Sequence, residues 1–106
     1  MNEITVELLK QRLDKGERLI LIDCREPYEF EVSRLSEYNY PLDRIESLVV
    51  DFENQKEAEI IVYCRSGRRS LIMVNMLQSL GFQNVKNLKG GILAWQAQID
   101  SSLPVA

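Results

Sequence analysis

Residues 59–70 read Glu59-Ile60-Ile61-Val62-Tyr63-Cys64-Arg65-Ser66-Gly67-Arg68-Arg69-Ser70, an apolar run that ends in a polar loop. A short apolar run without alternation of polar residues is typical of a strand that helices cover on both faces. Residues 71–80 after the loop are apolar nearly all round, so we expect a centrally buried helix that Gly81 ends. Strand, loop and helix in this order indicate one unit of an α/β fold.

The same alternation extends in both directions along the chain. Before the central unit we expect a helix capped by Thr5, a strand at 19–23, a short helix at 26–32, an irregular loop at 33–40 and a helix with Asp43 as its N-cap. After it we expect a weak strand at 85–88, a turn at Gly90-Gly91 and a helix at 92–99. Units spaced in this way predict a mainly parallel sheet with helices on both faces.

Length and composition predict one cytoplasmic domain spanning residues 1–106. The chain has 45% apolar residues and a net charge of −3, which gives no bulk attraction to nucleic acid or to an anionic membrane. Its first residues are acidic rather than basic, unlike a signal peptide, and no apolar run approaches the ~18 residues of a membrane span.

Cys64 is the predicted nucleophile. A thiol between a strand and a helix start meets free backbone N–H groups, the positive end of the helix dipole and, here, three arginines, all of which favour the thiolate. The chain has no histidine, so Ser-His-Asp and Cys-His mechanisms are excluded. Two cysteines without imidazole do not complete a zinc site, and we expect neither a metal nor a cofactor.

A second loop, Asp23-Cys24-Arg25, follows the first predicted buried strand. Because parallel strands end at the same edge of a sheet, this loop and the Cys64 loop are expected to form one site. Asp23 and Arg25 are expected to pair or to fix the loop by hydrogen bonds. The acidic residues Glu26, Glu29 and Glu31 are interpreted as a solvated helix face, and Phe82, Trp95, Met73 and Met76 as core.

Three motifs in this order resemble the single-domain rhodanese sulfurtransferases over nearly the whole chain. They are the stretch Asp23 to Phe30 after the first strand, the loop Cys64 to Ser70, and the tail from Gly81-Phe82 through Gly90-Gly91 to Trp95. The resemblance implies the rhodanese-like three-layer α/β fold. The chain departs from the family at 33–42, where Arg34 occupies the usual position of a histidine and two glycines are missing.

The resemblance also implies a sulfur transfer reaction. Cys64 would attack the outer sulfur of an anionic donor such as thiosulfate, release sulfite and retain a persulfide, which an acceptor such as cyanide, a thiol or thioredoxin then discharges. Gly67 would let the amides of residues 65–69, Ser66 included, converge on an anion. Arg65 and Arg68 would bind the donor, and Arg69 would close the loop and stabilise its charge.

Three alternatives stay open from the sequence. The module could pass a persulfide between proteins without turnover on small molecules. Phosphatases and arsenate reductases of the same fold are a further alternative, although they place five residues between cysteine and arginine, and here only four separate Cys64 from Arg69. Cys24 is either a packed residue at a strand end or, by analogy with those phosphatases, a redox partner of Cys64.

Overall fold

Strand β4 (Glu59–Tyr63) lies at the centre of a five-stranded sheet in the computed structural model, which describes residues 2–106. The strand order is β1-β5-β4-β2-β3, and every neighbouring pair is parallel. The other strands are β1 (Glu3–Ile4), β2 (Ile20–Asp23), β3 (Tyr38–Asn39) and β5 (Asn84–Leu88). The α/β class and the parallel sheet expected from the sequence are confirmed.

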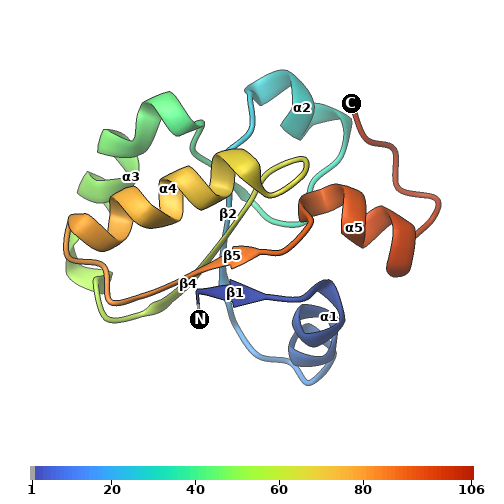
Figure 1. Cartoon of the computed structure of the whole chain (residues 1–106), viewed down its shortest axis with the longest axis horizontal. Coiled ribbons are helices and arrows are strands. Elements are labelled where there is room, and N and C mark those ends of the chain that lie inside the picture. The colour runs from blue at the N-terminus through green and yellow to red at the C-terminus, as the bar shows by residue number, and fades with distance from the viewer. Residues whose placement is uncertain (1) are drawn as a thin grey trace.

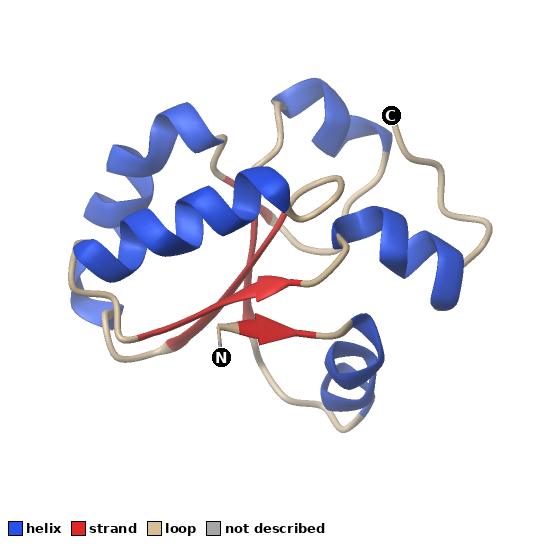
Figure 2. Ribbon diagram, in the orientation of Figure 1, coloured by secondary structure: helices blue, strands red, loops and turns tan. Residues whose placement is uncertain are grey.

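Helices cover both faces of this sheet (Figures 1 and 2). Ile60 and Val62 of β4 pack against α3 (Ile45–Asp51) and α4 (Arg68–Ser79) on one face. Ile61 and Tyr63 pack against α1 (Val6–Asp14) and α5 (Gly91–Gln98) on the other. The short helix α2 (Pro27–Val32) and the 3₁₀ turns η1 (Leu42–Arg44) and η2 (Glu53–Gln55) complete the elements. Between residues 2 and 106, no helix is long and apolar enough to cross a membrane.

Local sequence signals explain two helix starts and fail at a third. The Thr5 hydroxyl accepts a hydrogen bond from the Leu8 amide at 3.2 Å and so caps α1, as expected. Pro27 is the first residue of α2, where it needs no amide partner. The prediction that Asp43 caps a helix is wrong, because Asp43 lies inside η1 and Arg44 precedes α3.

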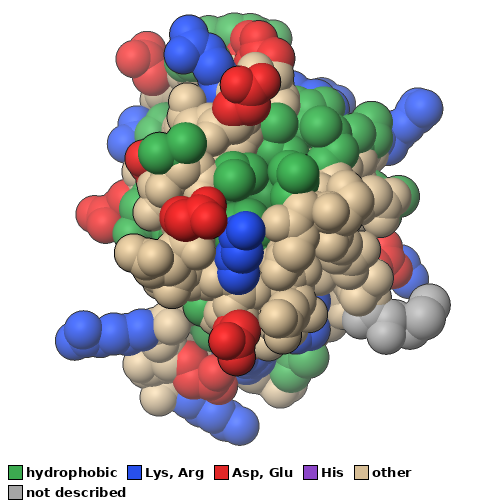
Figure 3. Space-filling model, turned by 90° about the vertical axis from the view of Figure 1, so that its left-hand side faces the viewer, with side chains coloured by type: hydrophobic (Ala, Val, Ile, Leu, Met, Phe, Trp, Pro, Cys, Tyr) green, Lys and Arg blue, Asp and Glu red, His purple; other side chains and the backbone are tan. Residues whose placement is uncertain are grey.

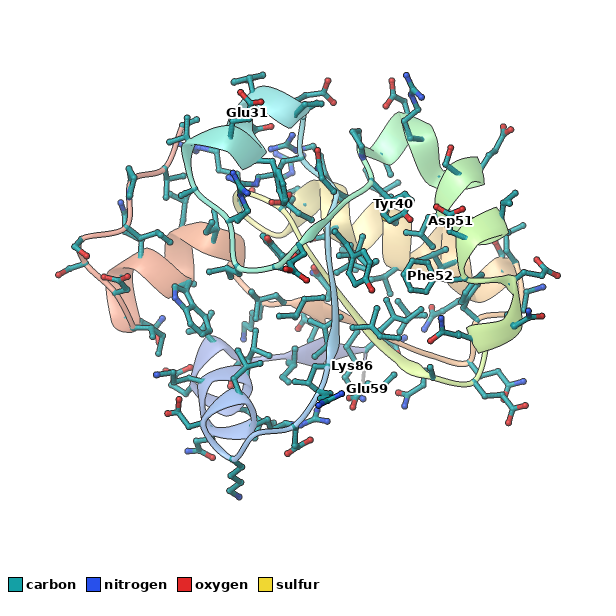
Figure 4. The ribbon with its side chains drawn as sticks, turned by 180° about the vertical axis from the view of Figure 1, so that it is seen from behind. Glu31, Tyr40, Asp51, Phe52, Glu59 and Lys86 are labelled. Carbon is teal, nitrogen blue, oxygen red and sulfur yellow. The ribbon has the colours of Figure 1, made fainter. Side chains whose placement is uncertain are left out.

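Two strands were not predicted, because runs of two residues have no periodicity to detect. β3 lies inside the segment expected to be an irregular loop, and Tyr38 and Asn39 pair in register with Ile22 and Asp23. The following residue, Tyr40, donates from its hydroxyl to Asp51 at 2.6 Å and packs its ring edge-on to Phe52 (Figure 4). These contacts tie the end of β3 to α3.

Helix α4 is not buried on all sides, contrary to the sequence prediction. Met73, Val74 and Leu77 are fully buried against the sheet. The opposite side of the helix is 40–52% exposed at the residues Leu71, Ile72 and Met76. Met76 is therefore not a core residue, because α4 forms an outer layer. Figure 3 views the molecule from the side where α4 ends and shows apolar side chains at the surface there.

Candidate active site

Cys24 and Cys64 lie side by side at the carboxyl end of the sheet. Asp23 of β2 is paired with Tyr63 of β4, and each cysteine is the next residue of its chain segment. The Cys24 amide donates to the Tyr63 carbonyl at 3.0 Å, which continues the ladder. Both cysteines are free, with exposed fractions of 0% and 1%. The fold therefore brings together the two loops that the sequence places at one edge.

The loop after Cys64 directs hydrogen-bond donors at its sulfur. The Gly67 amide lies 3.1 Å from Sγ, the Ser70 amide 3.4 Å and the Ser70 hydroxyl 3.3 Å. Gly67 is the N-cap of α4 and has φ +98°, a conformation that other residues adopt only with strain. Of the amides expected to converge, 65–69, that of Gly67 donates to Sγ, and Ser70 lies one residue beyond that range.

The surroundings of Cys64 lower its pKa to about 4. The largest cause is the neighbouring Cys24 thiol; the donors from Ser70 and Gly67 lower the pKa further, and burial opposes them. The same contact, together with burial and the charge of Asp23, raises the pKa of Cys24. These opposite shifts favour the thiolate on Cys64 and the protonated thiol on Cys24. A thiolate is the nucleophilic form of cysteine.

Asp23 and Arg25 form a fully buried ion pair, in which Arg25 Nη2 lies 2.7 Å from Asp23 Oδ2. The Asp23 carboxylate also accepts the Arg25 amide at 2.9 Å, and Arg25 Nη2 donates to the Ser33 carbonyl at 2.6 Å. These bonds fix the path of the chain from β2 into α2. The pair thus supports the loop that holds Cys24.

Arg69 is bound to Glu29 of α2 through two hydrogen bonds of 2.7 and 3.0 Å. Glu29 is only 4% exposed, so its interpretation as part of a solvated face is wrong; Glu26 and Glu31 are exposed. Arg69 lowers the pKa of Glu29. The ion pair closes the Cys64 loop against α2, and the positive charge of Arg69 is also felt by Cys64.

The other residues predicted to bind the donor lie on the outside of the loop. Arg65, Ser66 and Arg68 are exposed. Arg65 Nε donates to the Ala106 carbonyl at 2.9 Å. The cationic surface at the loop therefore consists of Arg65 and Arg68, whereas Arg69 faces inward.

The start of α5 holds the loop from behind. The Ile92 amide donates to the Cys64 carbonyl at 2.9 Å and the Leu93 amide donates to the Arg65 carbonyl at 3.0 Å. A Cβ at Gly91 would lie 2.5 Å from both carbonyl oxygens. The turn expected at Gly90-Gly91 thus also positions the nucleophile.

Sequence reasoning missed three residues of this site: Glu29, Ser70 and Asn87. Asn87 of β5 is 2% exposed and bonds to Ser70 and to the Gly67 carbonyl. Its one available signal was an amide side chain within the short run that was predicted to be a strand. Within residues 2–106, no group of three or more His, Cys, Asp or Glu side chains is arranged to hold a metal ion.

Comparison with known proteins agrees with this geometry. The model of the rhodanese-like domain family matches residues 5–98. The chain belongs to that family. Among structures of rhodanese-like domains, that of a Staphylococcus aureus rhodanese-like domain protein has a TM-score of 0.83 and 26% identity, covering 100% of this chain and 99% of the other. The rhodanese resemblance and the rhodanese-like fold predicted from the sequence are confirmed.

Several curated relatives are named sulfurtransferases. A protein of Allochromatium vinosum called "Sulfurtransferase" is 35% identical over 90% of this chain and 88% of its own length. The Zea mays "Adenylyltransferase and sulfurtransferase MOCS3-2" is 34% identical over 96% of this chain, which spans only 22% of that relative. Several matches are thus to one part of a longer protein.

Proposed function

We propose that this rhodanese-like protein is a sulfurtransferase that moves sulfane sulfur from thiosulfate, or a similar anionic donor, to a thiophilic acceptor through a persulfide on Cys64. The observation that supports this most is the buried Cys64 sulfur, which accepts hydrogen bonds from Gly67 and Ser70, lies beside Cys24 and has no histidine to deprotonate it. A nucleophile that is ionised by backbone and side-chain donors needs no general base.

In the loading step the Cys64 thiolate attacks the outer sulfur of thiosulfate. A bond forms between Cys64 Sγ and that sulfur, the sulfur–sulfur bond of thiosulfate breaks, and sulfite leaves with the electron pair. Cys64 retains a persulfide anion, so atoms and charge balance. Arg65 and Arg68, exposed beside the loop, attract the dianionic donor.

In the discharge step a nucleophile such as cyanide, or a thiolate from a small thiol or a protein, attacks the outer sulfur of the persulfide. The bond to Cys64 Sγ breaks, and Sγ leaves as the thiolate. The donors that lower the Cys64 pKa stabilise the same charge on the leaving sulfur. The donors therefore favour both half-reactions without any proton transfer by the protein.

The loop favours sulfur over phosphate or arsenate as the transferred group. Only four residues separate Cys64 from Arg69, and the Arg69 guanidinium is bound to Glu29. A guanidinium whose Nη1 and Nη2 each donate to a carboxylate has fewer hydrogen-bond donors left to bind a tetrahedral oxyanion. A single sulfur atom on Cys64 does not need these guanidinium donors.

The test is intact-protein mass spectrometry after thiosulfate treatment, followed by cyanide and a thiocyanate assay. We expect the wild type to gain one sulfur and to release it as thiocyanate over many turnovers, and Cys64→Ser to do neither. Loading from a persulfide donor protein, but not from thiosulfate, would indicate a carrier module instead. Hydrolysis of a phosphate ester without a sulfur adduct would overturn the proposal.

A further inference from the structure

The Ser70 hydroxyl has one hydrogen and two acceptors. Its oxygen lies 3.3 Å from Cys64 Sγ and 2.5 Å from Asn87 Oδ1. Ser70 is fully buried and has no contact with bulk solvent. Since a hydroxyl donates only one hydrogen, Ser70 bonds to the sulfur or to the amide oxygen at any moment.

Asn87 cannot reverse its amide to remove this choice. Its Nδ2 donates to the Gly67 carbonyl at 3.1 Å, and a carbonyl oxygen only accepts. The amide nitrogen therefore faces Gly67 and Oδ1 faces Ser70. Asn87 is held in place from β5, where its backbone amide donates to the Asn2 carbonyl at 2.7 Å.

The charge on Cys64 decides between the two acceptors. A thiolate attracts a donor more strongly than a neutral amide oxygen does, because hydrogen bonds to ions are about twice as strong as neutral ones. Once Cys64 carries an added sulfur, the negative charge lies mainly on the outer sulfur of the persulfide, and Sγ itself is a bonded sulfur and a weak acceptor. The amide oxygen of Asn87 is then the stronger partner for the Ser70 hydrogen.

We propose that Ser70 is a switching hydrogen-bond donor. Its hydroxyl donates to Cys64 Sγ while the thiolate is free, and rotates to donate to Asn87 Oδ1 when Cys64 takes up sulfur. Asn87 is then a positioning residue that stabilises the loaded state. The inference rests on the proposed function, because it concerns the two states of the same cysteine. Ser70 stabilises the free thiolate. Asn87 prevents a buried, unpaired hydroxyl in the loaded state, which would otherwise oppose loading.

The first test is a double-mutant cycle on the loading equilibrium. Ser70→Ala, Asn87→Leu and the double variant are equilibrated with mixtures of thiosulfate and sulfite, and the fraction with one added sulfur is measured by mass spectrometry. We expect Asn87→Leu to lower the loading constant about tenfold, because the Ser70 hydroxyl loses its partner. In the Ser70→Ala background the same substitution should have no effect.

Two matched controls lie on the same elements. Asn84→Leu changes an exposed asparagine of β5, and Ser79→Ala removes an exposed hydroxyl of α4; both should load like wild type. Equal effects of Asn87→Leu in both backgrounds would show that Asn87 supports the loop only structurally, and would overturn the proposal. Should Asn87→Leu fail to fold, the smaller Asn87→Ala replaces it in the cycle.

A second test needs no sulfur donor and therefore separates this inference from the proposed function. The Cys64 thiolate is titrated by the pH dependence of its alkylation. Ser70→Ala should lower the thiolate fraction about tenfold in the acid range, and Ser70→Thr, which keeps the hydroxyl, should restore it. Asn87→Leu should not lower that fraction. A lower fraction in Asn87→Leu, or no change in Ser70→Ala, would contradict the switch even if thiosulfate never loads the protein.

Discussion

At the scale of single residues, the charge of Cys64 depends on where hydrogen atoms lie. Two of its donors, the amides of Gly67 and Ser70, are fixed in the backbone, and the third is the Ser70 hydroxyl. None of them titrates near neutral pH, unlike the histidine that ionises many other catalytic cysteines. The reactivity of Cys64 should therefore vary little with pH over the range in which most thiols switch on.

Alkylation by iodoacetamide checks this expectation. Only the thiolate reacts, and the pKa of Cys64 is lowered to about 4. The alkylation rate should therefore be constant from about pH 6 to about pH 8. At lower pH the rate should fall, and it should reach half of its plateau value near the pKa of Cys64. An ordinary cysteine would react about tenfold faster per pH unit across that range. Cys64→Ser should lose the rapid labelling. A rate that still rises toward pH 8 would show that the donors do not ionise the thiol.

At the scale of elements, the ion pair of Arg69 and Glu29 joins α4 to α2. Glu29→Gln should lower the free energy of unfolding by about 1–2 kcal/mol, less than for a fully buried pair, because the Arg69 side chain is 35% exposed and screened by solvent. Urea unfolding measures this. Glu31→Gln, on the exposed side of α2, is the control and should change stability by less than about 0.5 kcal/mol. Equal losses in both variants would contradict a specific role of the pair.

The same pair has a defined pH dependence. The pKa of Glu29 is lowered in the folded protein, mainly by Arg69. Its contribution is therefore fully present above the ordinary pKa of an unfolded glutamate and is lost as the pH falls through the lowered folded value. The difference in unfolding free energy between wild type and Glu29→Gln should shrink on acidification and not on raising the pH.

The contact between α5 and the Cys64 loop depends on Gly91. Gly91→Ala should cost about 2–4 kcal/mol, because it adds strain at φ +64° and places a methyl group 2.5 Å from the carbonyls of Cys64 and Arg65. Gly16→Ala is the matched control: it has φ +81° but no atom within 4 Å, so it should cost only about 1 kcal/mol. Urea unfolding and Cys64 alkylation are measured on both. Equal stability of the two variants would show that the Cys64 loop can shift to accommodate the added methyl group at little cost in free energy.

At the scale of the whole molecule, the sequence predicts the layers better than their edges. The apolar run at β4 identified a covered parallel strand because every position of it is buried or nearly so. The strands β1 and β3 were not predicted, because they have two residues each and form only by pairing with strands from other parts of the chain. The exposed side of α4 was not predicted, because the apolar composition of a helix does not show which of its sides a neighbouring element covers.

The sequence likewise predicted the site residues that lie close together in the chain, but not those that reach the site from distant segments. Cys64, Gly67 and the pairing of Asp23 with Arg25 are local in sequence, and the sequence pointed to each of them. Glu29 and Asn87 reach the Cys64 loop across the fold, so only tertiary structure reveals them.

The two core layers share one sheet, and this leads to the last prediction. Adjacent residues of β4 point into opposite layers, Ile60 and Val62 into one and Ile61 and Tyr63 into the other, so neither layer can lose its packing without exposing the strand. In Cys64→Ser, where Cys24 is the one remaining thiol, two probes can follow the layers separately in urea. Thiol labelling reports Cys24 on the α4 side, and fluorescence reports Trp95 on the α1 side.

Both probes should give the same midpoint, as expected for one cooperative domain. Leu77→Ala truncates a side chain on the buried side of α4 and leaves a cavity in the layer that contains Cys24. It should lower both midpoints together and reduce the free energy of unfolding by about 2–5 kcal/mol. Val50→Ala removes an apolar side chain that is 72% exposed and should leave both midpoints in place. If Leu77→Ala shifts the thiol midpoint and not the Trp95 midpoint, the layers unfold separately, and the sheet does not couple the face that contains Cys24 to the face that contains Trp95.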